Sequence, residues 1–130
     1  MDFTYDEEQD ALRGSVRSLL TKAYGDFERR RETVATEPGF DEGLWKRLAE
    51  LGVLGLPFAE EDGGMGAGPV EVGLVCEEIG ATLSPEPFLT TVVLAGGLVA
   101  AAGTAEQRAR VLGGLAEGSL LPAFAHLEPG

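Results

Sequence analysis

The longest uncharged stretch of the sequence, PFLTTVVLAGGLVAAAG from Pro87 to Gly103, constrains the fold more than any other feature. A membrane span needs roughly 20 consecutive apolar residues, whereas this stretch is slightly shorter and contains two threonines and a Gly-Gly pair. We therefore expect Phe88 to Ala102 to form a helix that is apolar on nearly all sides and lies at the centre of a soluble domain. The remaining segments must then cover this helix.

The N-terminal residues have the pattern of an amphipathic helix. Thr4 and Glu7 are three residues apart, which predicts a capping box at the start of a helix that runs to about Lys22. The expected buried face repeats at the helical spacing and consists of Leu12, Val16, Leu19 and Leu20. The charged segment of residues 25–39 predicts an extension of this helix followed by a loop.

A second helix is expected to begin after Asp41, whose side chain can cap it, and to end at Gly52. Its apolar stripe consists of Leu44, Trp45, Leu48 and Leu51. The glycine-rich and proline-containing residues 53–69 predict an ordered loop.

The next pattern, Val70 to Ala81, predicts a third helix. Its inward residues are expected to be Val72, Val75, Cys76 and Ile79. Pro85 and Pro87 then interrupt the helical pattern, because each lacks a backbone donor and restricts the preceding residue. The apolar helix from Phe88 follows this break.

Thr104 and Gln107 form a second capping-box signal, at the start of a fifth helix that Gly118 should end. The apolar stripe of that helix is Val111, Leu112 and Leu115. After Ser119 the apolar period changes from helical to strand-like, in LLPAFAHLEPG. The expected fold class is therefore all-α, a bundle of about five helices in residues 1–119, with a first β-strand in residues 120–130.

Charge and cysteine content exclude several classes of function. The net charge is −12, and no lysine or arginine occurs between Arg47 and Arg108, which argues against a nucleic-acid partner. The single cysteine, Cys76, excludes an internal disulfide and a zinc cluster, so no metal site is predicted. Asp6, Glu7 and Glu8 stand where a signal peptide would be cationic, which predicts a cytoplasmic protein.

Three motifs in order resemble a known family. GTAEQRARVLGGLAEGSLLPAFAHLEPG, residues 103–130, resembles the end of the helical N-terminal domain of acyl-CoA dehydrogenases, where a G-T-x-E-Q helix leads to a strand reading A-x-A-x-T-E-P-G. Residues 51–80 resemble the L-G-x-x-G-L-x-x-P-E-x-x-G-G-x-G loop of that domain and its E-E-x-G helix. The resemblance covers essentially the whole chain.

This resemblance implies a flavoenzyme roughly three times this length, with a middle β-domain that begins at residue 120 and a C-terminal helical bundle. It implies dehydrogenation of an acyl-CoA thioester to the 2,3-enoyl-CoA: a glutamate of the C-terminal bundle removes the α-proton while FAD takes a hydride from the β-carbon. That glutamate lies beyond residue 130 in the family. We therefore assign no catalytic residue in this chain.

The resemblance also implies site residues and partners. Phe124, His126 and Leu127 match the positions of the first β-domain strand that face the flavin in the family. The implied partners are the acyl-CoA substrate, an electron-transfer flavoprotein or similar acceptor, and further subunits bound through the C-terminal domain as a homo- or hetero-oligomer.

Leu127 departs from the family pattern, in which a threonine before Glu-Pro offers its hydroxyl to the flavin. Leucine can offer only its backbone N–H. Some members work as heteromers in which one subunit has lost its flavin contacts, and this substitution would suit such a silent partner.

The two prolines are a second departure, because fatty-acyl members have a continuous helix here that lines the acyl tunnel. A shorter helix leaves more width and resembles members that act on bulky steroid side-chain thioesters. Thr90, Thr91 and Leu94 would then lie near the acyl group. Alternatively, the prolines make an ordinary turn and the apolar run is core.

Other interpretations stay open. His126, the only histidine, is more often structural than catalytic at a strand end, and Glu128 has no second acid near it in the sequence. A phosphate loop at EEDGGMGAG is rejected, because the segment lacks the lysine of such loops and carries three acids. The alternative function is a non-catalytic interaction domain or partner subunit that keeps the fold. An unpaired first strand is an aggregation liability, which favours the dehydrogenase hypothesis.

Overall fold

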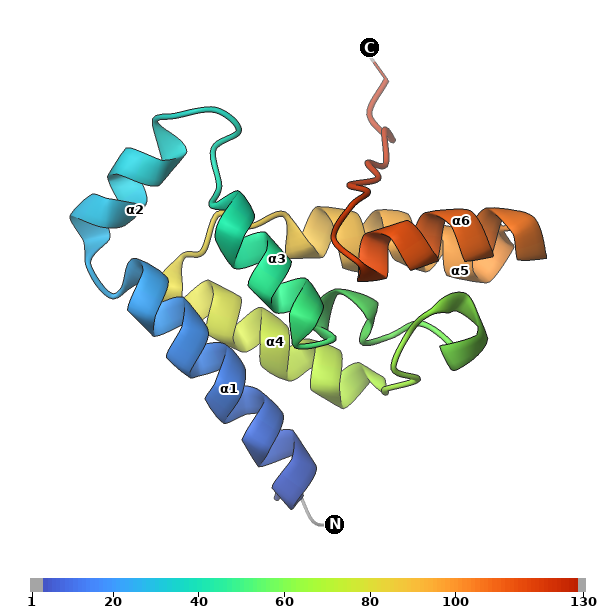
Figure 1. Cartoon of the computed structure of the whole chain (residues 1–130), viewed down its shortest axis with the longest axis horizontal. Helices are drawn as coiled ribbons and strands as arrows, with labels where there is room; N and C mark the ends of the chain where they lie inside the picture. Colours follow the sequence, from blue (N-terminus) through green and yellow to red (C-terminus); the bar gives the residue numbers. More distant parts are fainter. Residues whose placement is uncertain (1–3, 129–130) are drawn as a thin grey trace.

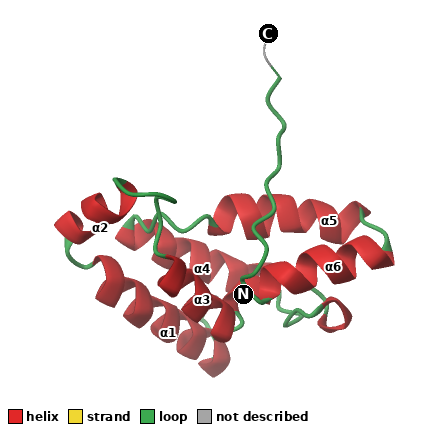
Figure 2. Cartoon of the chain, turned by 45° about the horizontal axis from the view of Figure 1, so that its top comes forward, coloured by secondary structure: helices red, strands yellow, loops and turns green. Residues whose placement is uncertain are grey.

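The computed structural model describes residues 4–128, and within that range the chain forms helices and loops but no strand (Figure 2). The elements in chain order are α1 (Glu7–Tyr24), α2 (Phe27–Val34), α3 (Glu42–Glu50), the 3₁₀ turns η1 (Val53–Gly55) and η2 (Glu60–Asp62), α4 (Pro69–Thr82), the π-helix η3 (Leu89–Gly96), α5 (Gly97–Ala102) and α6 (Ala105–Ala116).

Two groups of helices pack together around the short turn η1. In Figure 1, α1 and α4 lie side by side with α3 over them, while η3 and α5 form one rod that runs beside α6. The turn η1 contacts both α3 and α6 and so joins the two groups. This arrangement confirms the predicted all-α bundle.

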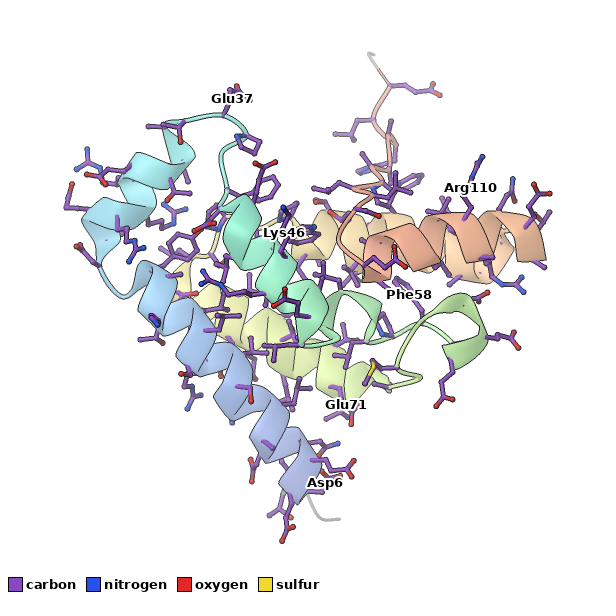
Figure 3. The ribbon with its side chains drawn as sticks, in the orientation of Figure 1. Asp6, Glu37, Lys46, Phe58, Glu71 and Arg110 are labelled. Atoms are coloured by element: carbon purple, nitrogen blue, oxygen red, sulfur yellow. The ribbon has the colours of Figure 1, made fainter. Side chains whose placement is uncertain are left out.

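The core lies where the two groups meet. Its largest fully buried side chains come from α1, α3, η1, α4 and α6 and from the segments just before η2 and η3: Phe58, Phe88, Leu20, Leu44, Leu48, Leu54, Leu74, Leu112 and Leu115. Figure 3 shows the labelled Phe58 below α6, whereas Arg110 on the outer side of α6 points away from the core. Burial of side chains of this size contributes about 1.5–3 kcal/mol each before the entropy cost of folding.

The first helix is capped two residues later than expected. Asp6, and not Thr4, is the N-cap: its carboxylate accepts from the Gln9 N–H at 2.8 Å, and the Gln9 side chain accepts from the Asp6 N–H at 3.1 Å. The predicted Thr4–Glu7 box is therefore wrong. Glu7 instead occupies the first helical turn, where its negative charge interacts favourably with the positive end of the helix dipole.

Residues 25–39 contain a separate helix, α2, where an extension and a loop were expected. Asp26 caps it by accepting from the Glu28 N–H at 3.0 Å. The helix contributes no buried residue, and Figure 1 shows it at the edge of the molecule. Its position therefore depends on the cap, on contact with α1 and on the hydrogen bond that Arg30 donates to the Leu83 carbonyl.

Other local signals are confirmed. Asp41 caps α3 by accepting from the Leu44 N–H at 3.0 Å, and Thr104 and Gln107 form the second capping box. Gly52 and Gly118 follow α3 and α6 with φ of 78° and 75°, a left-handed conformation that glycine adopts without strain. Leu51, expected in the apolar stripe of α3, is instead half-exposed because α3 ends before it.

The third predicted helix is α4, one residue longer at each end than expected. Val75 is fully buried, while Val72, Cys76 and Ile79 are partly buried against the core. The same helix also buries Leu74 and the charged Glu78, which the apolar pattern did not include.

The apolar run Phe88–Ala102 is helical, but the prediction that it lies at the centre is wrong. One side packs against α6 and Phe58, whereas Leu89, Leu94 and Leu98 are 57%, 44% and 48% exposed. The run forms the π-helix η3 and continues without a break into α5. An apolar composition alone does not distinguish a helix buried on all sides from a helix that exposes one apolar side to solvent.

The predicted strand after Ser119 is absent from the described residues. The Leu120 N–H donates to the Gly114 carbonyl at 3.0 Å, and no backbone hydrogen bond joins residues 121–128 to the described helices. Figures 1 and 2 show this segment leaving the helical body. A strand exists only with a partner strand, and residues 4–128 provide none. Pro129 and Gly130, the predicted end of that strand, lie outside the described residues.

Candidate functional site

The start of η3 positions the three residues predicted to contact an acyl group. Pro87 lacks an N–H, and its carbonyl accepts from the Thr91 N–H at 3.0 Å, from the Thr91 hydroxyl, and from the Thr90 hydroxyl at 3.3 Å. Both threonine hydroxyls are therefore bound to the preceding turn. This turn marks the point at which the chain enters the π-helix.

The structure separates the three residues. Thr90 and Leu94 are exposed and are four positions apart, whereas Thr91 is only 3% exposed and lies on the inner side with Val92 and Ala95. We name the exposed residues Leu89, Thr90, Leu94 and Leu98 the outer face of η3 and α5. It is apolar except for one threonine.

Gly96 holds the other end of η3 against the core. A Cβ added there would lie 2.5 Å from Cζ of Phe58 and 3.0 Å from Cδ2 of Leu115. Only a residue without a side chain permits this approach. The π-helix is therefore fixed at its end by the Phe58 ring and at its start by the turn at Pro87.

The three predicted flavin-contacting residues lie on the segment that leaves α6. The rings of Phe124 and His126 are stacked, with centroids 5.2 Å apart and an interplanar angle of 14°, and Leu127 is 86% exposed. Within the described residues no hydrogen bond or ring contact joins them to Thr90, Thr91 or Leu94. The two predicted groups of site residues are thus not brought together by contacts within residues 4–128.

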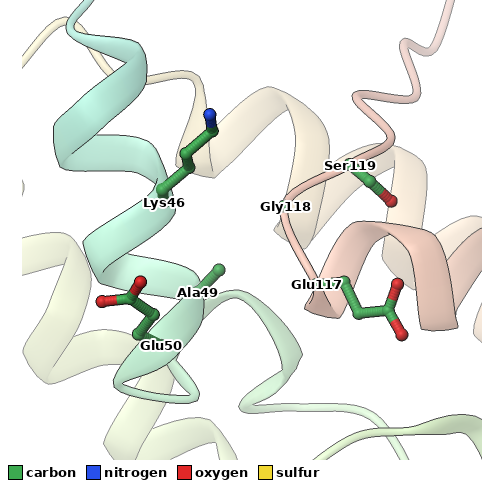
Figure 4. A pocket seen from close by; sticks show the side chains of 6 residues that line it. All are labelled: Lys46, Ala49, Glu50, Glu117, Gly118 and Ser119. Carbon is green, nitrogen blue, oxygen red and sulfur yellow. The ribbon is translucent and has the colours of Figure 1, made fainter.

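A hollow of about 440 Å³ lies where this segment begins (Figure 4). It is lined by Lys46, Ala49, Glu50, Glu117, Gly118 and Ser119. Figure 4 shows the two glutamates on opposite walls, so the single lysine is outnumbered by acids. This charge balance does not suit a phosphate or another anion.

Glu86, between the two prolines, is a buried carboxylate that sequence reasoning did not single out. It is 4% exposed and accepts hydrogen bonds from the Tyr24 hydroxyl at 2.5 Å, from the Asp41 N–H at 3.2 Å and from the Ser84 hydroxyl. Burial, and then the hydrogen bond to Glu86, raises the pKa of Tyr24, so the phenol remains a donor at neutral pH. The sequence signal that could have indicated Glu86 is its position at the start of the apolar run, in an interval without lysine or arginine.

Two further buried acids are balanced by cations. Glu78 of α4 binds Arg13 and Arg17 of α1, and Asp62 binds Arg108 of α6 with Nε 3.1 Å from Oδ2. The hydrogen bond from Arg17 lowers the pKa of Glu78, which keeps it charged. These pairs join α1 to α4 and the turn η2 to α6, so Glu78 and Asp62 are structural acids.

Several other kinds of site find no support in the described chain. Burial raises the pKa of the Cys76 thiol, which disfavours the reactive thiolate. Residues 4–128 contain no group of histidine, cysteine and acidic side chains that would hold a metal ion. No helix in this range is both long and apolar enough to cross a bilayer.

Comparison with known proteins gives one consistent family. Residues 6–119 match the family model described as acyl-CoA dehydrogenase, N-terminal domain. The acyl-CoA dehydrogenase FadE12 of Mycobacterium tuberculosis is 39% identical over 134 aligned residues, which cover 98% of this chain and 32% of the relative.

Solved structures give the same family and fold. The ChsE4–ChsE5 complex from Mycobacterium tuberculosis contains a chain with a TM-score of 0.81 and 33% identity, over 93% of this chain and 33% of that one. A variant of the Tcur3481–Tcur3483 steroid ACAD matches with a TM-score of 0.79 and 36% identity, over 88% of this chain and 31% of that one. The present chain spans about a third of the length of these relatives.

Proposed function

Since the chain belongs to the acyl-CoA dehydrogenase family, whose N-terminal domain it contains, we propose that it is the N-terminal part of an FAD-dependent enzyme that oxidises an acyl-CoA thioester to the 2,3-enoyl-CoA. In this proposal residues 1–119 are the helical domain and residues 120–130 begin a middle β-domain. The observation that carries the proposal is the outer face of η3 and α5. This apolar face is exposed in residues 4–128, and apolar patches of this kind mark ligand or protein contacts.

The outer face suits the acyl part of a thioester. Leu89, Leu94 and Leu98 would contact the hydrocarbon, and Thr90 lies among them. Thr91, with its hydroxyl bound to Pro87 and its side chain buried, would act from the inner side by holding the turn. The thioester carbonyl and the α-proton would be handled by groups outside this chain.

The residues of the C-terminal segment fit a planar cofactor. The stacked Phe124 and His126 rings and the exposed Leu127 offer flat and apolar surfaces, and the backbone of residues 121–128 has groups free to bond. FAD, when bound, supplies the acceptor for the hydride of the β-carbon. Leu127 would contribute a backbone N–H and apolar contact but no hydroxyl.

A bulky acyl group is the substrate class that the fold favours. The loop 83–87 breaks the helical path, so η3 starts only at Leu89 and leaves its outer face uncovered in residues 4–128. One relative of known structure is a variant of the Tcur3481–Tcur3483 steroid ACAD. We therefore propose a steroid side-chain thioester as the substrate. The proposed redox partner is an electron-transfer flavoprotein or a similar acceptor, and the proposed location is the cytoplasm.

A second candidate function rests on Leu127. A subunit without the threonine hydroxyl would suit the silent partner of a heteromer, and one relative was solved as the ChsE4–ChsE5 complex. In that case the chain's exposed surfaces would bind a catalytic subunit.

Anaerobic mixing of the native protein with acyl-CoA thioesters tests the proposal. We expect flavin absorbance that bleaches with a steroid side-chain thioester and gives the enoyl product. Flavin present only in a co-purifying subunit would support the silent-partner function instead. A native protein that neither contains flavin nor associates with a flavoprotein would contradict both.

A further inference from the structure

Glu86 accepts hydrogen bonds from two distant segments of the chain and from its own loop. Tyr24 comes from the end of α1, Asp41 is the N-cap of α3, and Ser84 lies in the loop that leads to η3. The first two donors are 62 and 45 residues away in sequence. One buried carboxylate therefore fixes the loop before η3 against two helices.

The environment of Glu86 differs from that of the other buried glutamate. Glu78 is 3% exposed and binds two arginines, whereas no lysine or arginine in the described chain pairs with Glu86. Its donors are two hydroxyls and one amide. A carboxylate can accept several such hydrogen bonds at once. Glu86 therefore serves to bind three donors, and not to neutralise a cation.

The bonds of Glu86 continue directly into the π-helix. The Phe88 N–H donates to the Glu86 carbonyl at 2.8 Å, and Thr90 and Thr91 bond to the next carbonyl, that of Pro87. π-Helical segments are rare in proteins and frequently occur at functional sites. A shift of Glu86 would therefore move the start of η3 and, with it, Thr90 and Leu94.

We propose that Glu86 is a positioning residue for the acyl-thioester site, which sets where the outer face of η3 meets the acyl group. This inference rests on the proposed function. Glu86 touches no reacting atom and acts through Pro87 and the first turn of η3.

The first test is structural and needs no cofactor. Glu86→Gln keeps the shape but replaces one acceptor oxygen by an NH₂ donor, so the hydroxyls of Tyr24 and Ser84 can no longer both donate to this side chain. We expect amide exchange of residues 89–96 to accelerate roughly tenfold. Glu78→Gln is the matched control, because it makes the same change at an equally buried carboxylate. Its global loss of stability should accelerate exchange in η3 and α6 alike, whereas Glu86→Gln should accelerate exchange in η3 more than in α6. The same ratio of η3 to α6 exchange rates in both variants would overturn the inference.

The second test measures selectivity in the complete native protein with its flavin. Glu86→Gln should raise KM for a bulky acyl-CoA roughly tenfold relative to a short-chain one, with flavin content unchanged. Ser84→Ala removes one donor and should shift the same ratio less, which keeps the inference falsifiable if Glu86→Gln does not fold. Glu78→Gln should leave the ratio unchanged.

The outcomes of these tests distinguish a failure of the positioning role from a failure of the proposed function. A wild-type protein with activity whose Glu86→Gln and Ser84→Ala variants lose only thermal stability overturns the positioning role alone. A wild-type protein that oxidises no acyl-CoA overturns the proposed function and the positioning role together.

Discussion

The guanidinium of Arg17 binds the carboxylate of Glu78 through two hydrogen bonds, with Nε 2.9 Å from Oε2 and Nη2 2.7 Å from Oε1. Arg13 adds a third bond, at 3.1 Å to Oε1. These contacts join α1 to α4, which lie side by side in Figure 1. The pairing is asymmetric, because the Glu78 side chain is buried and the Arg17 side chain is half-exposed.

Glu78→Gln should destabilise the 130-residue chain by about 1–3 kcal/mol at neutral pH. The folded-state pKa of Glu78 is lowered, so its contribution is complete above the unfolded pKa and is lost as pH falls through the folded pKa. The difference between wild type and variant should therefore shrink below about pH 4. Urea unfolding across this pH range measures it.

Glu77→Gln is the control for that prediction. Glu77 is the neighbouring acid, is exposed, and pairs with Arg13 at 3.3 Å. An exposed pair of this kind should contribute less than about 1 kcal/mol. Equal losses for the two variants would contradict the assignment of stability to the buried carboxylate.

Two glycine substitutions should change the free energy of unfolding in opposite directions. Gly118 has a φ of 75°, and a Cβ there would lie 3.1 Å from the Ala49 Cβ, so Gly118→Ala should cost about 1–2 kcal/mol. Gly73 is inside α4 with nothing within 4 Å of an added Cβ, so Gly73→Ala should stabilise by about 0.5–1 kcal/mol. The midpoints of thermal unfolding should move in opposite directions, and a common direction would refute this reasoning.

Gly96→Ala should destabilise by about 1–3 kcal/mol, because its Cβ would overlap the Phe58 ring. Gly97→Ala is the matched control at the next position, where an added Cβ meets no atom within 4 Å. Phe58→Leu should reduce the cost of Gly96→Ala, which a double-mutant cycle by urea unfolding detects. An additive cycle would show that the Phe58 contact is not the cause.

Sedimentation of the 130-residue chain should give a species near 13.6 kDa. We propose that assembly requires a C-terminal domain, which these residues do not include. A discrete, stable tetramer would show that the helical domain assembles through its own surfaces.

Local signals predicted most of the helix boundaries. Asp41, Gly52, Thr104 and Gly118 act on backbone groups within four residues, so their roles follow from sequence neighbours alone. The first cap was assigned wrongly because two such signals overlap, Thr4 with Glu7 and Asp6 with Gln9.

Features that depend on distant contacts were not predictable in this way. The exposure of Leu89, Leu94 and Leu98 follows from which side of η3 and α5 meets α6 and Phe58. The role of Glu86 follows from donors 62 and 45 residues away. The site residues on η3 and on the C-terminal segment were predicted from family resemblance, since no local pattern distinguishes them from core or loop.

Native mass spectrometry of the protein purified from its source tests the central proposal most directly, because one spectrum reports both chain length and bound flavin. The proposal predicts a polypeptide roughly three times 13.6 kDa that releases FAD on denaturation. A polypeptide of 13.6 kDa without flavin would contradict it.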